Sequence, residues 1–216
     1  TDEMMPVISH WGNGWHGLDA FGDPWNLILG FAVLFLARLL GNLYFINNIR
    51  HEELNARFRR QLIADVVPFL VFFLAFVIRT LLKDGFAVNP DNGLIVMEPF
   101  KYFHNLIEMP YLLILFLIGV VGVLYGIGKS IFCKTYTRGI WFAGIGTVLT
   151  VLALLLVAGY NHTAYYPSTA DLQSSLTIAN SCSSQFTLKT MAYVSILVPF
   201  VLAYIIYAWR AIDRKP

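Results

Sequence analysis

Among the few charged residues within the apolar stretches of this 216-residue chain, two of opposite sign are the first candidates for chemistry. Arg38 interrupts the apolar run 24–46, and Asp65 falls in the first turn of the run 63–82. A charge inside a bilayer is costly, so such residues pair with each other or mark a route for protons or ligands. By the helical rise, Arg38 lies about 12 Å from the end of its run. If the two runs form an antiparallel hairpin, we predict a buried Arg38–Asp65 ion pair. A proton or quinone role is the alternative.

A second group of polar residues precedes the apolar run 110–131, the third along the chain. Lys101, His104 and Glu108 are spaced i, i+3, i+7, which places them on one face of a helix. The sequence predicts a polar patch at the membrane interface, where such side chains remain solvated. A proton-handling or metal-binding patch is the alternative.

Glycines at positions 119, 122 and 126 follow one another within the third apolar run. Small residues four apart let two membrane helices approach closely. We therefore predict that Gly119, Gly122 and Gly126 pack against another helix, and we expect that helix to belong to another membrane subunit. A backbone hinge is the alternative.

Haem binding is a natural hypothesis for a membrane protein with histidines. An intramembrane b-type haem needs axial ligands, commonly His or Met, that project from helices into a bundle. No His falls near the middle of an apolar run: the five are His10, His16, His51, His104 and His162. Cys133 and Cys182 form no metal-binding spacing. We expect this chain to hold no cofactor, no metal and no catalytic residue of its own.

Five apolar runs must position these residues. Each run is about 20 residues long, which is enough to span a hydrocarbon core of about 30 Å. Their predicted bounds are 24–46, 63–82, 110–131, 140–160 and 191–209. The chain is 57% hydrophobic and 13% charged, and its net charge of +2 is too small to indicate nucleic-acid binding. The sequence predicts an all-α, polytopic transmembrane helix bundle with about five spans.

The loops between the runs alternate in Lys and Arg content, which predicts orientation. Ten of these residues fall in the first and third loops and the C-terminus, whereas three fall in the other loops. By the positive-inside rule, the N-terminus lies outside, the C-terminus is cytoplasmic, and the polar segment 161–187 is external. Between the runs, 47–61 predicts a separate surface helix and 83–93 an external turn.

The last fifth of the chain carries a recognisable pattern. Residues 174–191 read SSLTIANSCSSQFTLKTM, close to S-L-T-I-x-N-x-x-S-S-x-x-T-L-x-x-M, and the following run contains Val198-Pro199, Tyr204 and Trp209. This region resembles the C-terminus of subunit II of cytochrome bd-type quinol oxidases. The resemblance extends with lower specificity over most of residues 15–216.

The resemblance implies a place in a complex. In that family, subunit I carries haems b and d and oxidises quinol, while a non-haem subunit II packs beside it and supports its assembly and stability. The expected partners are therefore subunit I, lipid and quinone, in the bacterial cytoplasmic membrane. We expect residues 1–216 to form one transmembrane domain, about five of the usual eight spans, from the C-terminal part of a longer subunit. The alternative function is a transporter or channel module without a redox partner.

Overall fold

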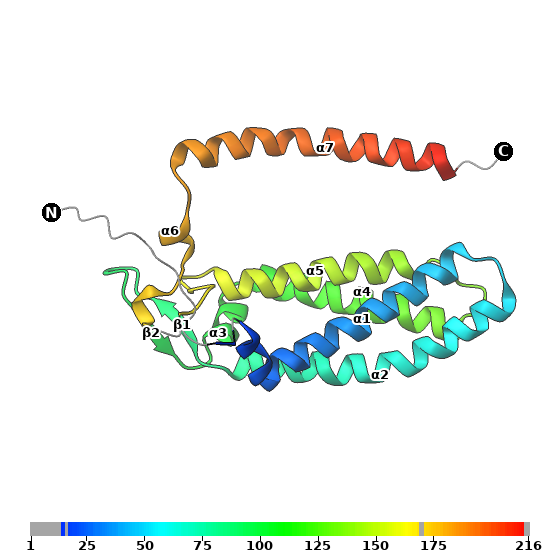
Figure 1. The fold of residues 1–216 in the computed structure, drawn as a ribbon, viewed down its shortest axis with the longest axis horizontal. Coiled ribbons are helices and arrows are strands. Elements are labelled where there is room, and N and C mark those ends of the chain that lie inside the picture. The colour runs from blue at the N-terminus through cyan, green and yellow to red at the C-terminus, as the bar shows by residue number, and fades with distance from the viewer. Residues whose placement is uncertain (1–13, 16, 169–170, 214–216) are drawn as a thin grey trace.

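The structure is a computed structural model that describes residues 14–15, 17–168 and 171–213. It is mostly helical, and five of its helices are long and apolar enough to cross a membrane. Figure 1 shows the arrangement. The elements in chain order are η1 (Leu18–Gly22), α1 (Pro24–Asn48), α2 (Glu52–Leu82), β1 (Gly85–Val88), β2 (Ile95–Glu98), α3 (Lys101–Glu108), α4 (Pro110–Phe132), α5 (Gly139–Gly159), η2 (Leu172–Ser174), α6 (Ile178–Ser181) and α7 (Gln185–Asp213).

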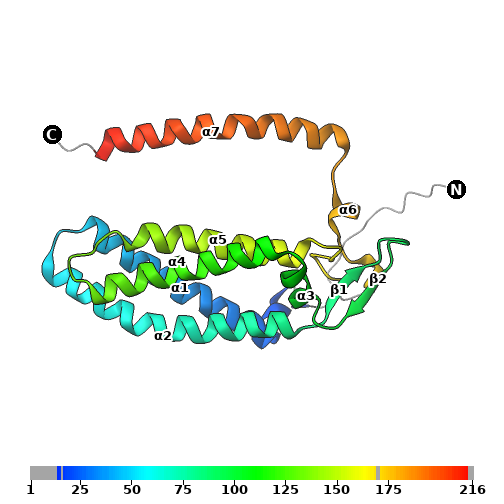
Figure 2. The same cartoon turned by 180° about the vertical axis from the view of Figure 1, so that it is seen from behind.

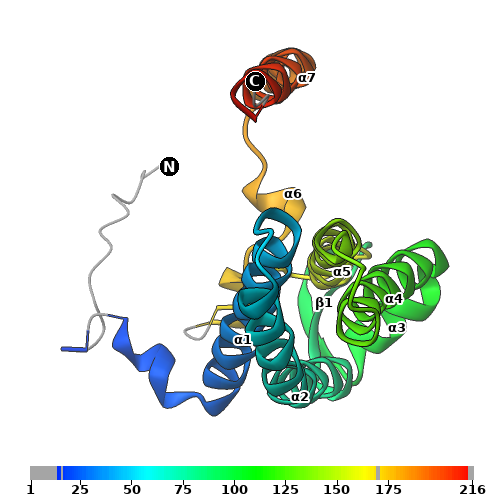
Figure 3. The same cartoon turned by 90° about the vertical axis from the view of Figure 1, so that its right-hand side faces the viewer.

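Four of the long helices form an antiparallel bundle. Helix α1 packs along α2 and helix α4 along α5, and the two pairs meet side by side (Figures 2 and 3). All four contribute to one buried apolar cluster, so the long apolar runs do supply a common core. Its members are Leu39, Leu43, Ile46, Leu62, Phe69, Val123, Ile127 and Ala143.

The first hairpin is tighter than the sequence predicted. Asp23 caps α1 by accepting a hydrogen bond from the Trp25 backbone N–H at 3.0 Å, and Pro24 occupies the first turn. Only residues 49–51 separate α1 from α2. The predicted separate surface helix over 47–61 is wrong, because α2 starts at Glu52 and continues without a break to Leu82. Leu62, in its charged half, is fully buried and joins the core cluster, which ties this half to the bundle.

At the opposite end of the bundle, the predicted turn over 83–93 is part of a small cap, because this range holds β1 and the turn at residues 90–92 that joins β1 to β2. Strands β1 and β2 form an antiparallel hairpin in which Gly85 pairs with Glu98 and Val88 with Ile95. Ala87 also pairs with Thr163, which follows α5. The expectation of a purely all-α fold is therefore wrong in this cap. Helix α3 ends at Glu108 with Met109 as its C-cap, and Pro110 starts α4 at a position that needs no backbone N–H donor.

Helix α7 lies apart from the other four (Figures 1 and 3). No part of its apolar stretch is buried, whereas 28% of the corresponding stretch is buried in both α4 and α5. A connection through α6 leads to α7, which then runs beside the bundle toward the end that holds the α1–α2 and α4–α5 turns. The described chain is thus a four-helix bundle with one separate apolar helix.

Candidate functional site

The structure brings Arg38 and Asp65 together between α1 and α2. One Arg38 amino nitrogen (Nη2) lies 3.0 Å from Asp65 Oδ1, and Arg38 Nε donates to Oδ2 at 3.2 Å. The Asp65 side chain is 2% exposed, but that of Arg38 is 49% exposed. The carboxylate therefore lies inside the bundle, while much of the guanidinium remains at its surface.

Two amides that the sequence analysis did not identify complete the shell of Asp65. Asn42 Nδ2 donates to Oδ2 at 3.4 Å, and Gln61 Nε2 donates to Oδ1 at 3.1 Å. Helical spacing could have indicated both amides. Asn42 is four residues from Arg38, and Gln61 is four residues from Asp65, so each pair shares a helix face. With a donor on each side, this carboxylate joins α1 to α2.

The predicted polar patch is present but divided into two parts. Lys101 Nζ lies 3.1 Å from Glu98 Oε2, and His104 Nδ1 lies 3.0 Å from Glu98 Oε1. Glu98, on β2, was not identified from the sequence. Its contacts, first the hydrogen bond with His104 and then Lys101, lower the pKa of the Glu98 carboxyl below its usual value.

Glu108 belongs to the second part, which is centred on buried Asn105. Asn105 Nδ2 donates to the Val157 carbonyl at 2.9 Å and to Thr163 Oγ1 at 2.8 Å. Asn161 Nδ2 donates to Asn105 Oδ1 at 3.0 Å and also to Glu108 Oε2. Asn105 therefore holds the end of α5 and the segment after it against α3. Its spacing from Lys101 and Glu108 places it on the predicted polar face.

The three predicted packing glycines face a helix of the same chain. A methyl group at Gly119 would lie 2.5 Å from Thr150 Oγ1, and one at Gly126 would lie 2.6 Å from the Gly139 carbonyl oxygen. One at Gly122 would lie 3.3 Å from the Gly146 Cα. These contacts are with α5. The expectation that this face packs against another subunit is wrong, because α5 already covers it.

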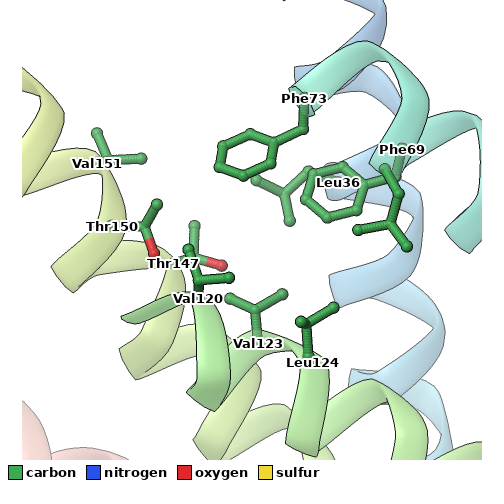
Figure 4. Close-up of a pocket in the computed structure, with 10 residues that line it drawn as sticks. Leu36, Phe69, Phe73, Val120, Val123, Leu124, Thr147, Thr150 and Val151 are labelled. Carbon is green, nitrogen blue, oxygen red and sulfur yellow. The ribbon is translucent and has the colours of Figure 1, made fainter. Parts of the chain in front are cut away.

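A small apolar cavity lies between the two helix pairs (Figure 4). Phe69 and Phe73 of α2 face Val120 and Val123 of α4 across it. The hydroxyls of Thr147 and Thr150 border the cavity, but they donate to carbonyls of their own helix at 2.8 Å. The cavity therefore offers apolar contact but no free polar group to orient a bound molecule.

An arginine that the sequence analysis left in the charged loop links the two helix pairs. Arg59 of α2 donates to the backbone carbonyl of Ser130 near the end of α4. It also donates to the carbonyls of Cys133 at 3.2 Å, Lys134 at 2.8 Å and Tyr136 at 3.0 Å. One guanidinium thus satisfies four carbonyls of the α4–α5 turn, which we call the Arg59 clamp.

The histidines of the described chain do not fit an axial haem site within the spanning helices. His51 caps the start of α2, His104 contacts Glu98, and His162 follows α5 in a left-handed backbone conformation. His10 and His16 lie outside the described residues. Within the described ranges no three His, Cys, Asp or Glu side chains cluster as metal ligands would. The three described histidines thus lie outside the five long helices that could span a membrane.

Comparison with known proteins identifies relatives of the whole chain. The family model described as "Cytochrome bd terminal oxidase subunit II" matches residues 4–212. The chain is 26% identical over 206 residues to "Cytochrome bd-I ubiquinol oxidase subunit 2" of Escherichia coli (strain K12), covering 89% of this chain and 53% of that protein. It is 29% identical over 159 residues to "Probable cytochrome oxidase subunit 2" of Haemophilus influenzae, covering 68% of this chain and 40% of that protein.

The chain therefore spans about half the length of these curated relatives or less. The family model nevertheless covers nearly all of it, including the four-helix bundle, the cap and almost all of α7. The resemblance noted in residues 174–191 thus extends over nearly all of the described structure. The chain belongs to the family of subunit II of the cytochrome bd terminal oxidases.

Proposed function

We propose that this chain is a non-haem part of a cytochrome bd-type quinol:oxygen oxidoreductase in a respiratory chain of the bacterial cytoplasmic membrane. Its role is to support the assembly and stability of a partner subunit that carries haems b and d and oxidises quinol. The family match over residues 4–212 is the observation that carries this proposal.

The separate helix supports a role in assembly. Tyr193, Phe200 and Tyr204 of α7 are 71%, 70% and 70% exposed, although each could bury a large apolar area against a partner. In lipid, helices associate through packing and interhelical hydrogen bonds, because lipid tails are as apolar as the helices themselves. Helix α7 therefore offers a complete spanning surface to a neighbouring membrane protein.

The test is to produce this chain with an affinity tag together with the haem-bearing partner subunit and to purify whatever remains bound to the tag. We expect a reduced-minus-oxidised spectrum with haem signals in the purified complex, and quinol-dependent oxygen consumption. A variant without residues 185–216 is expected to reach the membrane and to keep a stable bundle, but to recover several-fold less haem. Haem recovered in full by this variant would contradict an assembly role for α7.

A second arm separates assembly from catalysis. Turnover per recovered haem is expected to stay unchanged in the truncated variant, because the residues removed support association alone. Full haem recovery combined with loss of quinol oxidation would assign a catalytic or quinone-binding role to this chain instead.

We also propose the orientation that the charge pattern predicts, with the N-terminus outside and the C-terminus in the cytoplasm. The native cysteines allow a test, because both are exposed, Cys133 lies in the α4–α5 turn and Cys182 directly follows α6. Figure 1 shows α6 near the end of the bundle opposite to that turn. In spheroplasts, a membrane-impermeant maleimide is expected to label the Cys133→Ser variant at its remaining cysteine, Cys182. It is expected to label Cys182→Ser only after rupture of the membrane. The reverse pattern would overturn this orientation.

A further inference from the structure

A hollow with basic and apolar walls opens at the end of the bundle that holds the α1–α2 and α4–α5 turns. One wall is the first part of α2, and the other is the end of α4 with the residues that follow it. The charged residues of its lining are Glu52, Arg59, Arg60 and Lys134, and Ile63 and Ile131 belong to its apolar part. The hollow lies outside the ion pair, the polar cap and the apolar cavity described above.

The charge of this hollow is positive and only partly used by the protein. Arg59, Arg60 and Lys134 contribute three positive charges against the one negative charge of Glu52. Arg59 is held by the carbonyls of the clamp. In the described part of the chain, no hydrogen bond or ion pair engages the Arg60 or Lys134 side chain. Two exposed cations are therefore available to an anion.

The apolar side of the hollow continues toward the membrane. Ile63 is 53% exposed and stands one turn beyond Arg59 and Arg60, at the start of the apolar part of α2. Ile131 lies opposite, in the last turn of α4. Charges at the rim, with the exposed Ile63 and the half-buried Ile131 beside them, match the two parts of a phospholipid, a charged headgroup and acyl chains.

We propose that this hollow binds an anionic phospholipid. Arg60 and Lys134 contact the phosphodiester, Arg59 adds its charge from the clamp, and Ile63 and Ile131 contact the upper part of the acyl chains. The ligand chemistry is a phosphodiester with a net negative charge, since a zwitterionic headgroup would gain little from a hollow with net positive charge. The bound lipid would also lie against both walls, and so join α2 to the α4–α5 turn.

The test uses the detergent-purified complex that contains this chain, titrated with dioctanoyl phosphatidylglycerol and followed by native mass spectrometry. Each Lys or Arg near an anionic lipid surface contributes about 1 kcal/mol, a factor of about five. Arg60→Gln/Lys134→Gln is therefore expected to weaken binding of the first lipid about 25-fold. The matched control Arg50→Gln/Arg57→Gln removes two charges from the same end outside the hollow, and is expected to change affinity less than about three-fold.

Further arms identify the ligand. Dioctanoyl phosphatidylcholine is expected to bind at least about ten-fold more weakly, and inorganic phosphate at equal concentration is expected not to displace phosphatidylglycerol. Arg60→Lys/Lys134→Arg keeps both charges and is expected to retain binding. Any of four results would overturn the proposal. The two Gln double variants could lose affinity equally, or phosphatidylcholine could bind as tightly as phosphatidylglycerol. Phosphate could displace the lipid, or the charge-preserving variant could lose binding.

Discussion

The four-helix bundle and helix α7 are equally suited to a membrane by length and apolarity, but they differ in what their side chains contact. In the first pair, Phe31 of α1 stacks on Phe72 of α2 with ring centroids 5.3 Å apart, and Arg38 pairs with Asp65. In the second pair, α4 and α5 approach at their glycines. The apolar stretch of α7 has no buried residue.

This difference shows that two separate properties decide where a membrane helix lies. Apolarity places a helix in the bilayer, but it does not determine which helix packs against it. The reason is that apolar side chains contact lipid tails as favourably as they contact another helix. Complementary shape and buried polar contacts determine which helix packs against it. The bundle carries both within its own sequence, whereas no other described element covers the apolar stretch of α7.

The largest effect should come from filling the closest contact of the bundle. In Gly126→Leu, the added side chain starts 2.6 Å from the Gly139 carbonyl oxygen and 2.8 Å from the Ala143 backbone nitrogen, and backbone atoms cannot easily move aside. We expect a loss of about 3 kcal/mol in the free energy of unfolding. Chemical denaturation of the chain in detergent measures it.

The control for this change lies two residues away on the same helix. A methyl group at Gly128 would meet no atom within 4 Å. Gly128→Leu is therefore expected to leave the free energy of unfolding within about 0.5 kcal/mol of the unchanged chain. Equal losses in both variants would show that α4 requires glycine for another reason than its contact with α5.

The buried carboxylate should rank second. Asp65→Ala leaves Arg38 without its partner and Asn42 and Gln61 without an acceptor. Because half of the Arg38 side chain is exposed, we expect a loss of about 2 kcal/mol, below the range for a fully buried pair. Replacing both residues, in Arg38→Leu/Asp65→Ala, should cost less than Asp65→Ala alone. Unfolding measurements on the single and double variants test this, and strictly additive losses would contradict the pairing.

A smaller effect is expected in the cap as the pH falls. The pKa of the Glu98 carboxyl is lowered by His104 and Lys101, so its stabilising contribution is complete above the unfolded value of about 4.3. It is lost as the pH falls through the lower folded value. Glu98→Gln should therefore remove part of the acid dependence of the melting temperature, by about 1 °C, because these side chains are partly exposed. An unchanged acid dependence would exclude this contribution.

The smallest effect on the bundle should come from α7. Ala203 is exposed, and Ala203→Leu places a leucine side chain on an apolar helix, as Gly126→Leu does. We expect no measurable change in the melting temperature of the isolated chain, because no core residue lies against it. A decrease of several degrees would show that α7 packs on the bundle and would remove the contrast between the two regions.

The features that follow from local spacing were predictable from the sequence. Run length identified the five long helices, and the predicted start of the first run at residue 24 is the start of α1. The cap was not predictable, because β1 pairs partly with Thr163, some 75 residues further along the chain. The exposure of α7 was not predictable either, since its composition resembles that of the buried helices.

The candidate site shows the same division. The depth of Arg38 and Asp65 in their helices was enough to place them together. Spacing identified the glycines as contact residues, but it could not identify α5 as their neighbour, because a pattern on one helix does not specify the opposing surface. Glu98 was missed because it joins Lys101 and His104 from a strand that the sequence did not indicate.

The Arg59 clamp has a consequence for the order in which the chain is made. The carbonyls of the α4–α5 turn receive their donor from α2, a segment synthesised about 70 residues earlier. A ribosome delivers α1 and α2 to the membrane before α4 emerges, so the guanidinium is already in place when the second hairpin arrives. The clamp is therefore completed only when the later hairpin reaches the earlier one, and we expect loss of Arg59 to slow insertion of α4 and α5 more than that of α1 and α2.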